Sequence, residues 1–134
     1  MSHKRSFLCL DVGEKRIGTA VGDDAIRLAV PFGTIQVDGN ELKEIARLVL
    51  AESADTIIVG YPRNQSGEVT AQTAYVEAFA RQLIDMGEVI FQDESLTSVI
   101  AEERLKSYKK PYTKGDIDAQ AAAIILQDYL EQLP

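Results

Sequence analysis

With 134 residues, of which 46% are hydrophobic and 26% charged, the chain has the size and composition of one water-soluble domain. No apolar run approaches the roughly 20 residues that span a bilayer, and the stretch after the charged start is too short for a signal peptide. The single cysteine, Cys9, cannot form an internal disulfide, so we expect a cytoplasmic protein without a membrane partner. A net charge of −7, if evenly spread, argues against nucleic acid as a partner.

The first third of the chain predicts three strands. Apolar runs cover residues 7–12, 16–21 and 28–37, and turn-forming residues separate them. Because the links are too short to contain a helix, these strands must form an antiparallel meander. Pro31 inside the third run favours an edge or bulged strand.

The remaining chain alternates helices with short strands. Apolar residues recur at helical spacing behind Asn40, which we expect to cap that helix. The later elements are a strand at 56–59 ended by Gly60, a helix over 69–83, a strand at 89–92, and helices over 96–106 and 117–130. The order predicts one α/β domain, residues 1–134, with a mixed five-stranded sheet and helices on both faces.

Acidic residues stand at two predicted strand ends and at the start of the last helix. Asp11 ends the first strand, and the pair Asp93 and Glu94 follows the fifth. On the last helix Asp118 shares a stripe with apolar residues, whereas Asp116 shares a mostly polar stripe. We therefore expect Asp118 to face the sheet and Asp116 to face water or cap the helix. With the first strand central in the sheet, Asp11, Glu94 and Asp118 could converge.

Such a convergence predicts a metal site. Carboxylates that share a site repel one another unless cations neutralise them. Oxygen ligands without clustered histidine or cysteine select Mg²⁺ or Mn²⁺, which can promote phosphodiester hydrolysis. The only histidine, His3, lies in the N-terminal tail, so no Ser–His or Cys–His nucleophile is available. Asp11, Glu94 and Asp118 are the candidate catalytic residues, and Asp93 is a further candidate metal ligand.

Positive charge is concentrated in one window of the chain. Residues 104–114 contain five basic residues and no acid, so the window carries +5 and the rest of the chain −12. Two tyrosines are interleaved with the lysines. The window is either a solvated helix end and loop or a basic arm that contacts phosphates and stacks bases. The second interpretation makes Lys109, Lys110 and Lys114 candidate substrate-binding residues.

Four segments, in this order, resemble motifs of the YqgF/RuvX family: 11–23 (DVGEKRIGTAVGD), 60–67 (GYPRNQSG), 93–98 (DESLTS) and 114–126 (KGDIDAQAAAIIL). This family comprises bacterial proteins described as Holliday-junction resolvase-like enzymes and as pre-16S ribosomal RNA nucleases. The resemblance covers nearly the whole chain. It implies a ribonuclease H-like fold and a nuclease that removes the extra 5′ sequence from the 16S precursor.

The resemblance also assigns acidic site residues. The strand-one aspartate of the family falls on Asp11, and its last-helix aspartate falls on Asp118. Its acidic pair falls on Asp93 and Glu94, of which we favour Glu94. The assignment of Asp118 agrees with the choice made from the helical stripes.

One position departs from the family pattern. An arginine usually follows the acidic pair, but residue 95 is a serine here. If that arginine contacts phosphate, another cation must do so in this chain, and Arg16, Arg63 and Lys114 are the candidates. Arg16 is equally compatible with a surface ion pair. Asn64, in the same loop as Arg63, is a further candidate for substrate contact.

Three alternative functions stay open. A resolvase of branched DNA would need a homodimer, because paired sites must nick two strands, and the sequence does not distinguish a monomer from a homodimer. A non-catalytic nucleic-acid-binding module is compatible with the acidic overall charge. Residues 11–18 also resemble the phosphate-binding hairpin of actin-like ATPases. Those proteins need two similar lobes, whereas 134 residues have room for only a single lobe.

Overall fold

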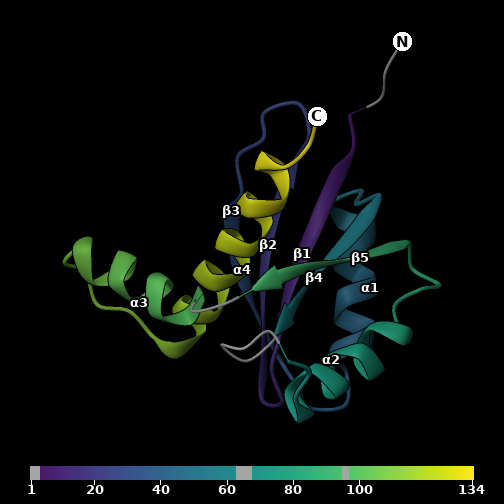
Figure 1. The fold of residues 1–134 in the computed structure, drawn as a ribbon, viewed down its shortest axis with the longest axis horizontal. Helices are drawn as coiled ribbons and strands as arrows, with labels where there is room; N and C mark the ends of the chain where they lie inside the picture. The colour runs from purple at the N-terminus through teal and green to yellow at the C-terminus, as the bar shows by residue number, and fades with distance from the viewer. Residues whose placement is uncertain (1–3, 63–67, 95–96) are drawn as a thin grey trace.

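The computed structural model describes residues 4–62, 68–94 and 97–134. Over these residues the chain forms one sheet with helices on both faces (Figure 1). The elements are, in chain order, β1 (Ser6–Val12), β2 (Arg16–Asp23), β3 (Val30–Gln36), α1 (Glu41–Ala51), β4 (Thr56–Pro62), α2 (Ala71–Arg81), β5 (Glu88–Glu94), α3 (Thr97–Ser107) and α4 (Lys114–Glu131). None of the helices in this described part is long and apolar enough to span a bilayer.

The five strands lie in the order β3-β2-β1-β4-β5. β2 is antiparallel to both β1 and β3, whereas β4 is parallel to both β1 and β5. The predicted meander, the central first strand and the mixed sheet are thus confirmed. Pro31 lies in the edge strand β3, and the β2–β3 register shifts beside it, between Thr19 and Ala20.

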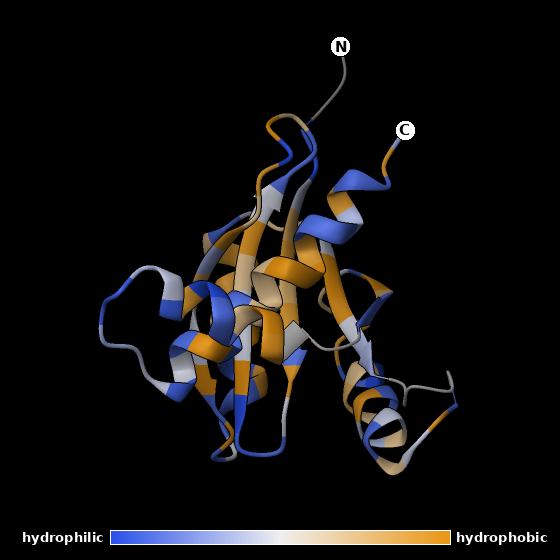
Figure 2. Cartoon of the chain, turned by 60° about the vertical axis from the view of Figure 1, so that its left-hand side comes forward, coloured by the Kyte–Doolittle hydropathy of each residue, from blue (hydrophilic) through white to orange (hydrophobic). Residues whose placement is uncertain are grey.

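The period of two along each strand divides the side chains between two cores. On one face Leu8 and Leu10 of β1 pack with buried residues of α1 and α2. On the other face Phe7 and Cys9 pack beneath α4. Figure 2 shows the hydrophobic segments gathered in the strands and in the helix that crosses them. Asp11 continues the series of Phe7 and Cys9, so its carboxylate lies on the α4 face.

Helix α3 stands away from the body of the domain (Figure 1). It packs on α4, where Ala101 contacts Ala121 and Ile124. Much of its surface is exposed, including Val99 and Tyr108. The basic window 104–114 comprises the end of this helix, the loop after it and the first residue of α4.

Some bounds differ from the expectation for local reasons. β4 continues past the predicted 56–59, and β5 past 89–92, because their parallel pairing runs on to Pro62 and Glu94. Asn40 occupies the predicted position directly before α1, but its side chain does not cap the helix. Its φ of −109° and ψ of 8° are not the extended conformation of a capping residue, and its side chain makes no capping hydrogen bond.

Candidate active site

Asp11 and Glu94 meet at one end of the sheet, on the face that α4 covers. Asp11 is near the end of β1, Glu94 is the last residue of β5, and β4 lies between these strands. The two carboxyl groups lie close enough for each to affect the pKa of the other. Glu94 Oε2 is buried and has no hydrogen-bond partner among the residues described. Because buried polar atoms normally have partners, this unpartnered oxygen makes the pair a candidate functional site.

Burial, together with neighbouring negative charge, raises the pKa of both carboxyl groups. Burial raises the pKa of Asp11 from 3.8 to about 6, the charge of Asp118 adds to this, and the hydrogen bond with Glu94 partly opposes it. Burial, followed by the charge and hydrogen bond of Asp11, raises the pKa of Glu94 from 4.5 to about 8. Burial thus favours the protonated form of Glu94 over its charged form. A nearby cation would oppose both shifts.

Two glycines make room for this arrangement. Gly60 in β4 lies against the carboxyl group of Glu94, and a Cβ at residue 60 would overlap Glu94 Oε2. Gly18 in β2 pairs with Asp11, and a Cβ at residue 18 would overlap the backbone carbonyl of Asp118. The absence of these two side chains lets α4 and the end of β5 approach the strand that carries Asp11.

Asp118 is held by Arg16 of β2. Arg16 Nε donates a hydrogen bond to Asp118 Oδ2 at 2.6 Å, and this ion pair is partly buried. Helix α4 begins at Lys114, about one turn earlier than expected, because Thr113 and Asp116 form a capping box. Asp116 thus takes part in the helix cap and Asp118 faces inward, as their helical stripes predicted.

The carboxylates do not by themselves form a finished metal site. Within the described ranges, no three His, Cys, Asp or Glu side chains are placed to hold a metal ion together. The chemistry of Asp11, Glu94 and Asp118 nevertheless fits a hard cation. All the donors are oxygens, Glu94 Oε2 lacks a partner in the part of the chain described, and the charge of Asp118 already acts on Asp11.

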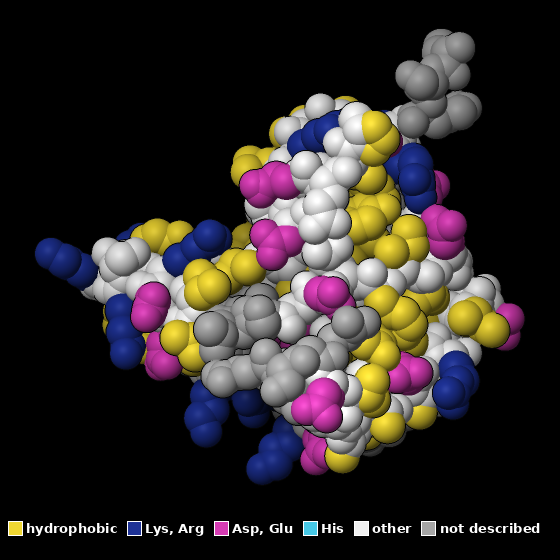
Figure 3. Space-filling model, in the orientation of Figure 1, with side chains coloured by type: hydrophobic (Ala, Val, Ile, Leu, Met, Phe, Trp, Pro, Cys, Tyr) yellow, Lys and Arg dark blue, Asp and Glu magenta, His cyan; other side chains and the backbone are white. Residues whose placement is uncertain are grey.

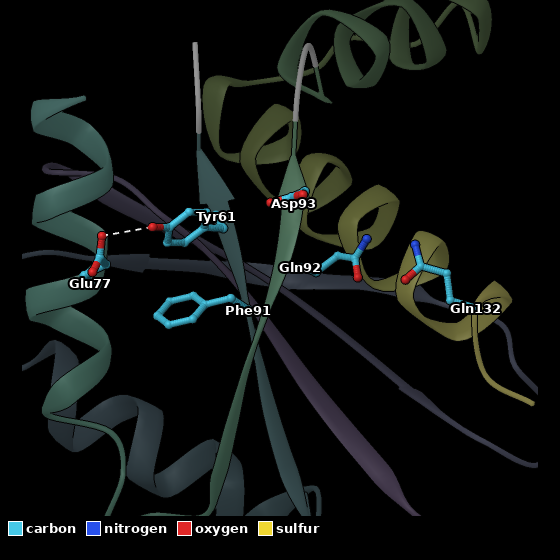
Figure 4. Close-up of a pocket in the computed structure, with 6 residues that line it drawn as sticks. All are labelled: Tyr61, Glu77, Phe91, Gln92, Asp93 and Gln132. Carbon is cyan, nitrogen blue, oxygen red and sulfur yellow. Dashed lines mark hydrogen bonds between the residues drawn. The ribbon is translucent and has the colours of Figure 1, made fainter. Parts of the chain in front are cut away.

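Asp93 lies on the other face of β5, because successive side chains of a strand alternate. It lines a pocket of about 510 Å³ together with Tyr61, Glu77 and Phe91 (Figure 4). Tyr61 donates a hydrogen bond to Glu77 at 3.0 Å, and its ring meets Phe91 edge-on with centroids 5.0 Å apart. The structure therefore does not bring Asp93 together with the carboxyl pair that includes Glu94.

The three predicted substrate-binding lysines are solvent-exposed. Lys109 and Lys110 follow α3, and Lys114 begins α4, one helical turn before Asp118. None of them takes part in the ion pairs recorded for the described residues. Figure 3 shows lysine and arginine side chains projecting around α3, at the left of the molecule. Their charge is available to an anionic partner.

The remaining candidates divide into described and undescribed residues. Arg63 and Asn64, together with the serine at position 95, lie outside the described residues, so the predictions for them stay predictions. Arg16 is described, and both possibilities raised for it are compatible with the geometry. Its Nε holds Asp118, while no partner is recorded for Nη1 and Nη2 within the described residues, so these nitrogens can bind a phosphate oxygen.

Comparison with known proteins decides the family. The family model described as "RuvX: Holliday junction resolvase" matches residues 5–132. The chain belongs to the RuvX family. Relatives from Chloroflexus aggregans and Synechocystis, each named "Putative pre-16S rRNA nuclease", are 40% and 39% identical to it. These matches cover 96% and 98% of this chain and 95% and 90% of the relatives.

Solved structures support the fold of this RuvX member. Thermus thermophilus RuvC in complex with a Holliday junction substrate matches with a TM-score of 0.55 and 14% identity, over 94% of this chain and 93% of that chain. The fowlpox virus resolvase with Holliday junction DNA matches with a TM-score of 0.58 and 13% identity, over 94% and 97%. Both share the predicted ribonuclease H-like fold.

Sequence patterns missed one contributor to the site of this RuvX member. They placed Gly60 at the end of a strand, whereas the structure places it within β4 and against Glu94. A glycine directly after the buried run 56–59 is a signal for close approach by another group as well as for a turn. Choosing between these meanings requires knowing that Glu94 lies on the same face of the sheet.

Proposed function

We propose that this RuvX-family chain is a divalent-metal-dependent nuclease in which Asp11, Glu94 and Asp118 are the catalytic and metal-binding residues. The observation that carries the proposal is the buried Asp11–Glu94 carboxyl pair, with an unpartnered oxygen in the described structure and a third carboxylate close enough to act on it. When bound, Mg²⁺ or Mn²⁺ supplies positive charge that neutralises the carboxylates and lowers the pKa of water for attack on phosphorus. Asp93 faces away, which supports Glu94 as the ligand from the acidic pair.

The other residues of the site bind and orient. Arg16 fixes one oxygen of Asp118 through Nε and offers its terminal nitrogens to a non-bridging phosphate oxygen. Gly18 and Gly60 keep the acidic groups close together by leaving no side chain between them. Lys109, Lys110 and Lys114 bind the nucleic-acid backbone beyond the scissile phosphate.

We further propose that the substrate is pre-16S ribosomal RNA and that the chain matures its 5′ end in the cytoplasm. The names of relatives about 40% identical over nearly the whole chain support this choice. The charge distribution also supports a localised contact. A body with a charge of −12 repels a polyanion, so substrate must enter along the side that carries the window 104–114.

Cleavage of branched DNA is the second candidate function. The description of the family model and the junction DNA bound by the two structural neighbours favour it. Symmetric cutting of a junction would need two active sites held by a dimer. A single active site suffices for trimming an RNA end.

A side-by-side cleavage assay tests these proposals. End-labelled 16S precursor RNA with its 5′ extension and a labelled four-way DNA junction are each incubated with the chain, with Mn²⁺ or with EDTA. We expect cleavage of the RNA extension in Mn²⁺ alone, and its loss in Glu94→Gln. Glu88→Gln, the same substitution at the exposed start of β5, serves as the matched control and should retain activity.

The other outcomes of this assay identify the alternatives. Selective cutting of the junction would replace the RNA assignment with a resolvase. Tight binding of either substrate without cleavage in any metal would indicate a non-catalytic binding module. In a parallel incubation with ATP, hydrolysis of ATP combined with no cleavage of either nucleic acid would support the actin-like alternative and refute the nuclease.

A further inference from the structure

One buried side chain of β5 is polar and takes part in none of the interactions that hold the fold together. Gln92 is only 9% exposed, yet no hydrogen bond of its amide group is recorded within residues 4–62, 68–94 and 97–134. Buried amides normally have partners, because unpaired donors and acceptors cost free energy in the interior. An apolar side chain of the same length would avoid that cost. The amide of Gln92 is therefore available to a ligand.

Gln92 lines the pocket of about 510 Å³ at the outer edge of the sheet (Figure 4). Gln132, which directly follows α4, lines the same pocket, and its side chain also has no hydrogen bond recorded in the described part of the chain. β5 is the last strand at this edge of the described sheet, so the pocket is open on that side. Two glutamine amides are thus accessible from one pocket.

The pocket fits an uncharged ligand that donates and accepts hydrogen bonds side by side. A glutamine amide offers a carbonyl acceptor and two N–H donors without a charge. Glu77 and Asp93 also line the pocket, and their negative charge disfavours a phosphate group there. The edge of a nucleobase presents neighbouring donors and acceptors, and glutamine forms two hydrogen bonds with N6 and N7 of adenine. Phe91, which lines the pocket from the other face of β5, adds an exposed aromatic ring.

Gln92 also lies beside the acidic site. Residues two apart in a strand point to the same face, so Gln92 and Glu94 both lie on the α4 face, about 7 Å apart along β5. Gln92 pairs in register with Gly60, the residue that makes room for the carboxyl group of Glu94. A single nucleotide can bridge this distance, so a base at Gln92 would belong to a nucleotide next to a phosphate at Glu94.

We propose that Gln92 and Gln132 bind an unpaired nucleobase, with adenine preferred, from the nucleotide next to the phosphate that is cut. A base that is stacked and paired in a duplex cannot enter such a pocket, so the cut strand must be unpaired at this nucleotide. The position of the base relative to the cut phosphate rests on the proposed nuclease function, whereas binding of the base does not. Gln92 is thus a specificity-determining residue and not a catalytic one.

NMR titration of the full chain in EDTA tests the pocket. Adenosine, 2′-deoxyadenosine and uridine are the probes, because each carries a base without a phosphate. We expect the side-chain NH₂ resonances of Gln92 and Gln132 to shift saturably and equally with the two adenine nucleosides, and uridine to bind about tenfold more weakly. Gln92→Met should weaken adenosine binding about tenfold, followed through the backbone amides of residues 91 and 93. Gln82→Met is the matched control, because Gln82 is an exposed glutamine directly after α2 and outside the pocket, and this variant should bind as the parent chain does.

Thermal unfolding separates recognition of a ligand from a structural role. Met has nearly the size of Gln and no amide to leave unpaired, so Gln92→Met should keep or exceed the Tm of the parent chain. A Tm lower by several degrees would show that the amide supports the fold and would overturn the proposal. No resonance shift with any nucleoside, undiminished binding by Gln92→Met, equal affinity for uridine, or binding that requires the 2′-hydroxyl would each overturn it as well.

The titrations need neither metal nor cleavage, so they separate base binding from the proposed nuclease function. Adenosine binding by a chain that cleaves no nucleic acid in Mn²⁺ would support the base pocket and refute the nuclease. Cleavage by a chain that binds no nucleoside would refute the base pocket alone.

Discussion

Replacing Glu94 by Gln removes the buried carboxyl group with the larger rise in pKa and keeps a hydrogen-bond donor for Asp11. The pKa of Glu94 is about 8 in the folded chain, compared with 4.5 ordinarily. Between these values Glu94 is protonated in the folded state and charged in the unfolded state. Its contribution to stability is therefore fully present below pH 4.5 and is lost as pH rises toward 8.

The difference between the two pKa values sets the magnitude. At about 1.4 kcal/mol for each pH unit, the ceiling is about 5 kcal/mol. The side chain of Glu94 is partly accessible to solvent, so screening leaves an expected effect of about 1 to 2 kcal/mol. At pH 8 Glu94→Gln should be more stable than the parent chain by this amount, which raises its Tm by several degrees. The difference should shrink toward zero near pH 5.

Thermal unfolding followed by circular dichroism from pH 5 to pH 9, with EDTA present, measures this difference. Added Mn²⁺ should then raise the Tm of the parent chain at pH 8 and raise that of Glu94→Gln much less. Glu88→Gln, at the exposed start of β5, should show the metal response of the parent chain. A parent chain that gains stability over Glu94→Gln from pH 5 to pH 8 would refute the argument from the buried carboxyl pair.

Gly18→Ala should destabilise the chain by about 1 to 3 kcal/mol in urea unfolding, because the new Cβ would overlap the α4 backbone, and an unchanged midpoint would contradict this close approach. Asp118→Asn should abolish metal-dependent cleavage, whereas Asp116→Asn, which alters only the helix cap, should retain it. The opposite pattern would show that the helical stripes of these two aspartates were misassigned. Replacing both Lys109 and Lys110 by alanine should weaken substrate binding and reduce the slope of log affinity against log salt concentration by about 1 to 2. An unchanged slope would show that these lysines belong to a solvated loop that does not contact the substrate.

Much of the architecture is set by features local in the sequence. Short apolar runs joined by links too short for a helix allow only an antiparallel meander over residues 7–37, whatever the rest of the chain does. Pro31 cannot donate a hydrogen bond within a central strand, so this one residue restricts β3 to an edge or a bulged position. The period of the last helix likewise separates Asp118 from Asp116, because residues four apart share a face before any packing is known.

The assembly of the site was decided by contacts between distant parts of the chain. Arg16 and Asp118 are 102 residues apart, and their pairing depends on the empty space at Gly18, which lets α4 approach β2. Strand alternation shows that Asp93 and Glu94 face opposite ways, but only the packing of α4 shows which of them meets Asp11. Secondary structure follows from periodicity among neighbouring residues. The meeting of these carboxylates depends instead on how whole elements pack, which local periodicity does not determine.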